Sequence, residues 1–205
     1  MSYRFDNRSV DEFKKHIKFS TLLENYFFTR WVKSCERLDH VRIENPRDNG
    51  VDNTGEFIEK GKTSGADYMV NFNYRGVEIK DMPLEVKWVP TYGKLTLKIG
   101  DLKAYIRENA AILFIYNAKK SKIDLRIPKK DYNFDKHIGL IESVENQLKW
   151  GVMIPQNVKN LLDFAIKYDK VKNINYMGGK PGIVINQNEF SDWFFEENWS
   201  QPWKR

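Results

Sequence analysis

Two Glu-x-Lys pairs within one strand-like stretch are the residues of this sequence whose types and spacing could do chemistry. Glu85 and Lys87 form one pair, and Glu78 and Lys80 form the other a few residues earlier. Side chains two apart on a strand project from the same face, so each pair sets a carboxylate beside an ammonium group. With a second carboxylate nearby, such acids favour a hard divalent cation such as magnesium. The lysine could then orient the attacking water or help to deprotonate it.

A hairpin predicted around the turn Tyr-Arg-Gly-Val distinguishes the two pairs. Folding the chain at this turn places Asp67 opposite Glu85 or the residue before it, whereas Glu78 falls opposite Asn73, beside the turn. Apolar side chains occupy one face of the hairpin, so Asp67, Glu85 and Lys87 share the other face. Two carboxylates and one ammonium group therefore converge at one end of the hairpin. The earlier pair is interpreted as solvated surface charge.

Hydrophobic periodicity predicts the elements that must hold these side chains. Residues 10–36 are predicted to be helical in two pieces, and residues 45–65, rich in Asn, Asp and Gly, are predicted to form a long loop. A change of apolar phase in the returning strand predicts a bulge at residues 81–83, where a proline stands. The remaining predictions are strands at 40–45, 66–73, 77–89, 94–98 and 110–117, an edge strand at 121–128, helices at 100–109 and 155–170, and a turn, a short strand and an aromatic-rich helical end within 178–199.

The stretch Gly-Ala-Asp-Tyr-Met-Val, followed by Leu-Glu-Val-Lys-Trp, resembles the PD-(D/E)XK nuclease superfamily. Ala66 stands where the motif has proline. The element order predicted between residues 20 and 127 matches the αβββαβ scheme of that superfamily. The resemblance implies an α/β protein with a restriction-endonuclease-like αβββαβ core and a mixed central sheet. Residues 1–127 would hold the N-terminal helices and this core. Residues 128–205 would form a C-terminal α+β elaboration packed on it, within a single compact domain.

The resemblance also implies a function, a magnesium-dependent DNA endonuclease that hydrolyses phosphodiester bonds and leaves a 5′-phosphate. Asp67, Glu85 and the backbone carbonyl of Val86 would bind the metal, for which manganese should substitute, and Lys87 would position the water. Many members carry a further glutamate on the first helix, and Glu24 fits that place. Glu24 interrupts an apolar stripe, and a carboxylate there is costly unless it is paired or binds a metal. The alternative is a buried acid paired with an Arg or Lys.

Further charged residues near the motif are candidates for the same site. Lys94, Lys98 and Lys103 could contact the phosphates that flank the scissile bond, helped by the helix start that follows Lys98. The alternative is that they are ordinary solvated lysines. Glu56 and Glu59, in the long loop, are alternative metal-binding acids.

Composition limits the classes of protein that are compatible with the sequence. The net charge of +6, from 34 Lys+Arg against 28 Asp+Glu, allows a polyanionic partner without requiring one. A single cysteine excludes an internal disulfide framework and a Cys-based zinc cage, and the three histidines lack zinc-binding spacing. No apolar run approaches the roughly 18 residues of a membrane span. The polar N-terminus lacks the apolar stretch of a signal peptide, so a cytoplasmic protein without a membrane partner is expected.

The expected partner is double-stranded DNA, and a homodimer is expected because two-fold DNA sites favour two-fold proteins. A type II restriction enzyme or a phage or mobile-element (homing-type) endonuclease is the leading expectation. The alternatives are a catalytically inactive nuclease-like nucleic-acid-binding module, a junction-resolving or repair nuclease, and a basic structural or assembly protein. Dependence on a divalent metal separates the nucleases from the other classes.

Overall fold

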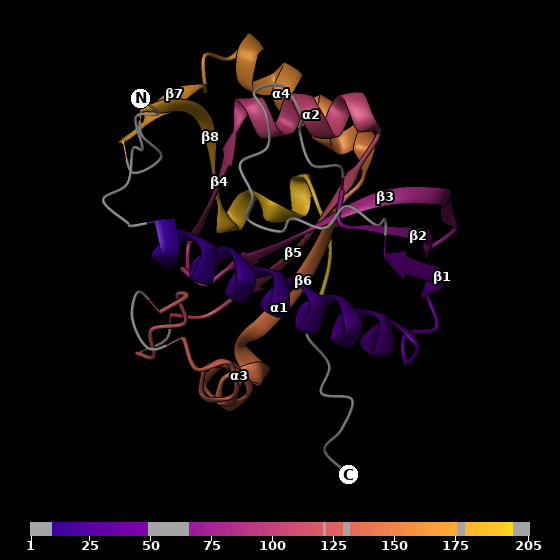
Figure 1. The fold of residues 1–205 in the computed structure, drawn as a ribbon. Helices are drawn as coiled ribbons and strands as arrows, with labels where there is room; N and C mark the ends of the chain where they lie inside the picture. Colours follow the sequence, from indigo (N-terminus) through magenta and orange to yellow (C-terminus); the bar gives the residue numbers. More distant parts are fainter. Residues whose placement is uncertain (1–9, 49–65, 121, 129–131, 176–178, 199–205) are drawn as a thin grey trace.

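The computed structural model describes residues 10–48, 66–120, 122–128, 132–175 and 179–198, and Figure 1 shows the fold. The helices are α1 (Val10–Cys35), α2 (Ile99–Glu108), α3 (Phe134–Ser143) and α4 (Pro155–Lys167), with short 3-10 helices η1 (Glu145–Gln147) and η3 (Gln187–Asp192). The strands are β1 (Val41–Asp48), β2 (Tyr68–Tyr74), β3 (Val77–Val89), β4 (Lys94–Lys98), β5 (Ala111–Asn117), β6 (Leu148–Met153), β7 (Lys172–Ile174), β8 (Lys180–Asn186) and β9 (Phe195–Asn198).

The central sheet has the strand order β1-β2-β3-β5-β6-β9. β3 and β5 are parallel, whereas the other neighbouring strands are antiparallel. The structure is therefore α/β with a mixed central sheet, which confirms that part of the prediction. All seven residues of β5 are buried, as expected for a strand that is covered on both faces.

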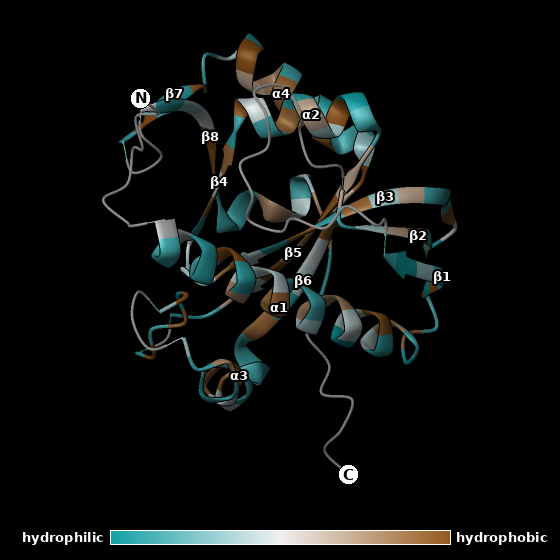
Figure 2. Cartoon of the chain, in the orientation of Figure 1, coloured by the Kyte–Doolittle hydropathy of each residue, from teal (hydrophilic) through white to brown (hydrophobic). Residues whose placement is uncertain are grey.

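Helices cover both faces of the central sheet (Figure 1). On one face, α1 packs against a core that includes Leu84, Leu113 and Trp150. On the other face, α2 and α4 pack against Ile112 and Phe114 of β5. Figure 2 shows teal and brown surfaces alternating along α1, the pattern of a helix with one buried side. Because β5 supplies alternate residues to each face, two hydrophobic cores meet at this strand.

The third strand of the predicted core, β4, belongs to a second sheet, which has the order β4-β8-β7. The strand predicted at residues 94–98 is present, but it leaves the central sheet after β3 and pairs antiparallel with β8. Residues beyond 128 in turn supply β6 and β9 to the central sheet. The C-terminal part of the chain therefore completes the sheet that carries the Glu-x-Lys pair.

Helix α1 is continuous from Val10 to Cys35, so the prediction of two helical pieces is wrong. The reason is that this stretch contains neither proline nor glycine, the residues that most strongly interrupt helices. Leu23, Phe27 and Trp31, each one turn apart, are at most 1% exposed and face the sheet. No helix within the described ranges is long and apolar enough to cross a membrane.

An edge strand is predicted at residues 121–128, but the described part of it, residues 122–128, follows an irregular path and forms no strand. Leu125 is buried at 1% exposure, and its backbone carbonyl accepts a hydrogen bond from the Trp88 indole at 3.1 Å. The apolar–polar alternation that favoured a strand instead reflects one anchored side chain between exposed neighbours. β1 also extends to Asp48, three residues beyond the predicted start of the long loop.

The aromatic-rich end predicted to be helical is helical only in part: η3 covers Gln187–Asp192, whereas Phe195–Asn198 form strand β9, which pairs with β6. Its side chains alternate between two environments, as in any strand. The Phe195 ring stacks on Tyr74 at 4.7 Å, whereas the next residue, Glu196, accepts hydrogen bonds from Tyr116 and Lys149. Phe194, at 4% exposure, and Phe195 thus pack within the protein.

The two ends of the central sheet approach each other on the α1 side. Glu197 of β9 lies 2.7 Å from His40 Nε2, accepts a hydrogen bond from the Tyr74 hydroxyl at 3.1 Å and lies 3.5 Å from Arg75. His40 lies just before β1, and Tyr74 and Arg75 lie at the turn between β2 and β3. β9 is at the opposite end of the strand order. The sheet is therefore strongly curved, and its last strand braces the turn of the hairpin.

We expect the docking of α1 to depend on Phe27, which is fully buried with its ring stacked on Trp88 at 4.7 Å. Phe27→Ala should lower the free energy of unfolding by about 3–5 kcal/mol, because it leaves a cavity at the helix–sheet contact. The control is Leu22→Ala, on the same helix but 41% exposed, which should stay within about 0.5 kcal/mol of wild type. Urea unfolding would measure both, and equal losses would contradict the described helix orientation.

Candidate active site

The candidate site lies where the pairing between β2 and β3 ends. Tyr68, the first residue of β2, pairs with Leu84, while β3 continues to Val89 alongside β5. Just before β2, the Asp67 carboxylate accepts a hydrogen bond from the Val86 backbone N–H at 3.3 Å. The N–H and C=O groups of one strand residue leave on the same edge. The Val86 carbonyl is therefore directed to the side on which Asp67 lies.

The hairpin register agrees with the predicted one. Glu78 pairs with Asn73 beside the turn, and the register shifts by one residue between the pairs made by Val70 and Phe72. Asp81, the first residue of the predicted bulge, has a positive φ of 45°, and its backbone N–H donates to Asn71 at 2.9 Å. After this bulge, Leu84 and Val86 of β3 face the core. Glu85 and Lys87, which alternate with them, therefore lie on the opposite face of the strand.

Glu85, Lys87 and Tyr105 form a connected group on that face. Lys87 Nζ donates to Glu85 Oε1 at 2.8 Å, and the Tyr105 hydroxyl donates to the same oxygen at 3.0 Å. The two charged side chains are 19% and 27% exposed, so the pair is shielded without being cut off from solvent. By contrast, Glu78 and Lys80 lie 3.8 Å apart and are more than half exposed, which agrees with the surface-charge interpretation.

The surroundings of Lys87 keep its side chain protonated. Burial disfavours the charged form, but the Glu85 carboxylate and the Tyr105 hydroxyl outweigh that effect and raise the pKa well above its ordinary value of 10.5. An ammonium group can donate hydrogen bonds but cannot accept a proton. In this arrangement Lys87 can orient a water molecule or stabilise negative charge, whereas acting as a base would first require the loss of its proton.

Helix α1 brings Glu24 to the same end of the hairpin. Phe28 stacks on Tyr68 with 3.7 Å between ring centres, and the Tyr68 hydroxyl donates a hydrogen bond to Asn25. These contacts fix the helix turn that carries Glu24. No hydrogen bond or ion pair joins Glu24 to another described residue, and the charges that act on it come from Asp67, Glu85 and Lys87.

The acids at the site carry more negative charge than their surroundings stabilise. Burial and then the Glu85 charge raise the pKa of Asp67 from 3.8 to about 7, against opposing effects of the Val86 N–H and Lys87. Burial and then the charges of Asp67 and Glu85 raise the pKa of Glu24 from 4.5 to about 8, with Lys87 opposing. A divalent cation would relieve this repulsion, so the donor chemistry fits a hard metal ion.

The number of side-chain ligands limits which metal ion the site could hold. Within the described residues, no group of three or more His, Cys, Asp or Glu side chains is close enough together to hold a metal ion. Asp67, Glu85 and the Val86 carbonyl offer a smaller set of oxygen ligands. Magnesium keeps several waters and is commonly bound through one or two carboxylates, whereas calcium needs more protein oxygens. The set therefore suits magnesium better than calcium.

A groove of about 400 Å³ opens beside the acids. Its lining residues include His16 and Glu24 of α1 and Lys87 and Trp88 of β3. Arg126 from the irregular segment also lines it. An elongated substrate could therefore reach Lys87 from this side.

The three lysines predicted to contact phosphates lie on other elements. Lys94 is exposed on β4, Lys98 is the half-buried residue that precedes α2, and Lys103 is exposed on α2. Among the described residues, no hydrogen bond or ion pair joins them to the acids of the site. Glu56 and Glu59 lie outside the described residues.

Sequence reasoning missed Tyr105 and Arg126, which reach the site from distant parts of the chain. Tyr105 belongs to the buried side of α2 together with Leu102, a spacing that marks it as inward-facing without revealing its partner. Nothing in the local sequence indicated that Arg126 lies at the site, because residues 121–128 were interpreted as an edge strand.

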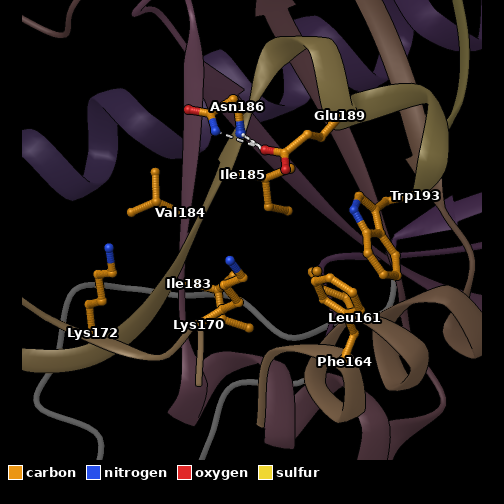
Figure 3. Close-up of a pocket in the computed structure, with 10 residues that line it drawn as sticks. All are labelled: Leu161, Phe164, Lys170, Lys172, Ile183, Val184, Ile185, Asn186, Glu189 and Trp193. Carbon is orange, nitrogen blue, oxygen red and sulfur yellow. Dashed lines mark hydrogen bonds between the residues drawn. The ribbon is translucent and has the colours of Figure 1, made fainter. Parts of the chain in front are cut away.

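A larger cavity, of about 440 Å³, lies away from these acids between α4, β8 and η3 (Figure 3). Trp193 lies at one side of it, Lys172 lies at the other side, and Lys170 lies between them (Figure 3). Glu189 is the carboxylate among its lining residues, and it is already bonded to Asn186 at 2.8 and 2.9 Å. This cavity therefore lacks the paired acids that would suit metal-assisted chemistry.

No family model, curated protein or solved structure matches this chain. The function is therefore argued from the arrangement at the end of the hairpin. That arrangement combines acids with raised pKa values, a protonated lysine, a backbone carbonyl and an adjacent groove. It could bind a divalent cation, orient water and stabilise negative charge on an anionic substrate.

We expect the acids to make the metal-free protein less stable as pH rises. Glu24 binds its proton more tightly in the folded chain than in the unfolded chain, so stability falls between about pH 4.5 and pH 8. Glu24→Gln should reduce that fall and should raise the melting temperature at pH 8 relative to wild type. Below pH 4 the two proteins should differ little from this cause.

Thermal melts in EDTA across this pH range would measure the effect. Glu78→Gln, an exposed acid on the same hairpin, is the matched control and should follow the wild-type profile. A Glu24→Gln profile parallel to wild type would show that Glu24 is not in the charged cluster.

Proposed function

We propose that this chain is a magnesium-dependent DNA endonuclease with a restriction-endonuclease-like core. The observation that carries the proposal is the meeting of Asp67, Glu85 and Lys87 at the end of the β2–β3 pairing, beside the Val86 carbonyl. Glu24 of α1, acted on by the charges of the same residues, is a further acid of the site. The resemblance to the PD-(D/E)XK motif supports the same reading.

Each residue has a role in this proposal. Asp67, Glu85 and the Val86 carbonyl would hold a magnesium ion, which would supply Lewis-acid stabilisation of the charge that develops on the phosphate. Lys87 donates a hydrogen bond that orients the attacking water. The water oxygen forms a bond to phosphorus while the bond to the 3′ oxygen breaks. The water gives up one proton to bulk solvent through the open groove, and the 3′ oxygen takes one proton from bulk solvent. The products carry a 5′-phosphate and a 3′-hydroxyl. Glu24 acts as an additional acid beside the ion.

Double-stranded DNA is the proposed substrate, and the net charge of +6 supports a polyanionic partner. Lys94, Lys98 and Lys103, on β4 and α2, remain proposed contacts to phosphates that flank the scissile bond. A homodimer acting as a type II restriction enzyme or a mobile-element endonuclease is the proposed biological form.

A nuclease-like module that binds nucleic acid without cutting is the second candidate. It is favoured by the hydrogen bonds that Lys87 and Tyr105 donate to Glu85, which already occupy one carboxylate oxygen. If that pairing persists with DNA bound, Glu85 has one oxygen left for an ion. This candidate predicts DNA binding that does not lead to cleavage with either magnesium or manganese.

We expect the wild-type protein to cleave supercoiled, linear or four-way-junction DNA with magnesium or manganese and to lose activity in EDTA. Glu85→Ala and Lys87→Ala should each lower the cleavage rate by at least about 100-fold, because each removes a group that stabilises charge at the reacting phosphate. Gel assays of the three substrates would measure this. Comparison of the substrates also separates junction resolution from cleavage of linear duplex.

The chain supplies its own matched control in the earlier Glu-x-Lys pair. Glu78→Ala and Lys80→Ala remove the same residue types from the same strand and should leave cleavage within about threefold of wild type. Wild-type cleavage that persists in Glu85→Ala, or that needs no metal, would rule out the proposed mechanism.

A further inference from the structure

The irregular segment at residues 124–127 is fixed to the strand that carries Lys87. Trp88 follows Lys87 directly, and its indole N–H donates to the Leu125 carbonyl at 3.1 Å. The Trp88 ring is itself stacked on Phe27 of α1. With Leu125 buried at 1% exposure, the next residue, Arg126, is held at the groove that Lys87 also lines.

The Arg126 guanidinium is oriented by Asp124. Its Nε lies 2.8 and 3.1 Å from the two Asp124 carboxylate oxygens, and one terminal nitrogen lies 2.6 Å from the second oxygen. A two-point contact of this kind fixes the plane of the guanidinium. Arginine has five N–H donors, so donors remain that have no partner among the described residues. The side chain is 69% exposed, which leaves these donors accessible.

The chemistry of the groove suits one phosphodiester strand. Lys87 and Arg126 are both cations that line it. Lys119, Lys120 and Lys122, earlier in the segment that leads to Arg126, are exposed as well. A planar, permanently charged guanidinium with free donors matches a phosphate group better than a neutral ligand. Glu24 also lines this groove, and Arg126 is paired with Asp124, so the accessible remaining donors of Arg126, rather than a net positive charge, are what favour a phosphate here.

We propose that Arg126 binds a DNA phosphate adjacent to the scissile one, so that the cleaved strand follows the groove between α1 and residues 126–127. This inference rests on the proposed nuclease function, since it takes Lys87 to lie at the reacting phosphate. Asp124 is a positioning residue that sets the direction of the guanidinium. The lysines of residues 119–122 extend the contact to phosphates farther along the strand.

Fluorescence anisotropy with labelled duplex and four-way-junction DNA tests the proposal, in EDTA and separately with Ca²⁺. Arg126→Ala should raise the dissociation constant about tenfold, as expected for the loss of one charged hydrogen-bonded contact. The dependence of log K on log salt should become shallower by about one, because one fewer phosphate is neutralised. The dissociation constant of Arg126→Lys should lie between those of wild type and Arg126→Ala. Lysine keeps the positive charge but lacks the planar guanidinium that can donate two parallel hydrogen bonds.

The matched control is the double variant Lys170→Ala and Lys172→Ala, which removes two cations from the larger cavity of Figure 3. It should leave the dissociation constant and the salt dependence unchanged. In single-turnover cleavage, Arg126→Ala should raise the DNA concentration needed for half-saturation while the rate at saturating DNA stays near wild type. Such a split indicates a contact made equally in the ground state and the transition state. A circular dichroism melt confirms that each variant is folded.

Three results would overturn the inference: unchanged affinity and salt slope in Arg126→Ala, an equal loss in the lysine control, or no DNA binding by wild type under either condition. Failure of the nuclease proposal looks different. Wild-type protein that binds DNA with the Arg126 dependence but does not cleave it with magnesium or manganese would remove the catalytic function and keep the binding path.

Discussion

The point at which β2 stops pairing with β3 is the constraint on which the candidate site depends. Beyond Leu84, a backbone N–H on that edge of β3 needs a new acceptor, because an unpaired backbone group away from water is costly. Asp67 supplies it through the hydrogen bond from Val86. The same bond that completes the backbone pairing therefore places a carboxylate beside the Glu-x-Lys pair. A longer β2 would satisfy Val86 with backbone and would leave no role for this side chain.

Partial burial then determines the electrostatics. Lys87 and Tyr105 stabilise Glu85, whereas Asp67 and Glu24 are left with raised pKa values because burial and neighbouring acids act in the same direction. The acids cannot move apart, since aromatic stacking holds α1 against the sheet. In the proposed function, such a site would bind a cation with few protein ligands. In the metal-free protein, the repulsion among these buried acids lowers the free energy of unfolding. The packed core offsets this loss.

Local pattern in the sequence was enough for the parts of the site that lie within one hairpin. Alternation of apolar residues gave the strand faces, the turn gave the register, and the phase change gave the bulge at Asp81. It could not show that β4 leaves the central sheet, that β9 joins it, or that Tyr105 and Arg126 approach Lys87. Those placements depend on contacts between residues far apart in sequence. The short segment at 122–128 also shows that alternation over a few residues does not distinguish a strand from an anchored loop.

The contacts of Glu197 with His40, Tyr74 and Arg75 have a consequence for synthesis of the chain. Protein chains emerge from the ribosome N-terminus first, so the hairpin with its acids is made long before β6 and β9 exist. Until the last strand arrives, the turn lacks its support and one edge of β5 lacks its neighbour. A nascent chain therefore carries all the acids of the site before it has the scaffold that holds them together. If the proposed nuclease function holds, this order would delay activity until β9 has been made.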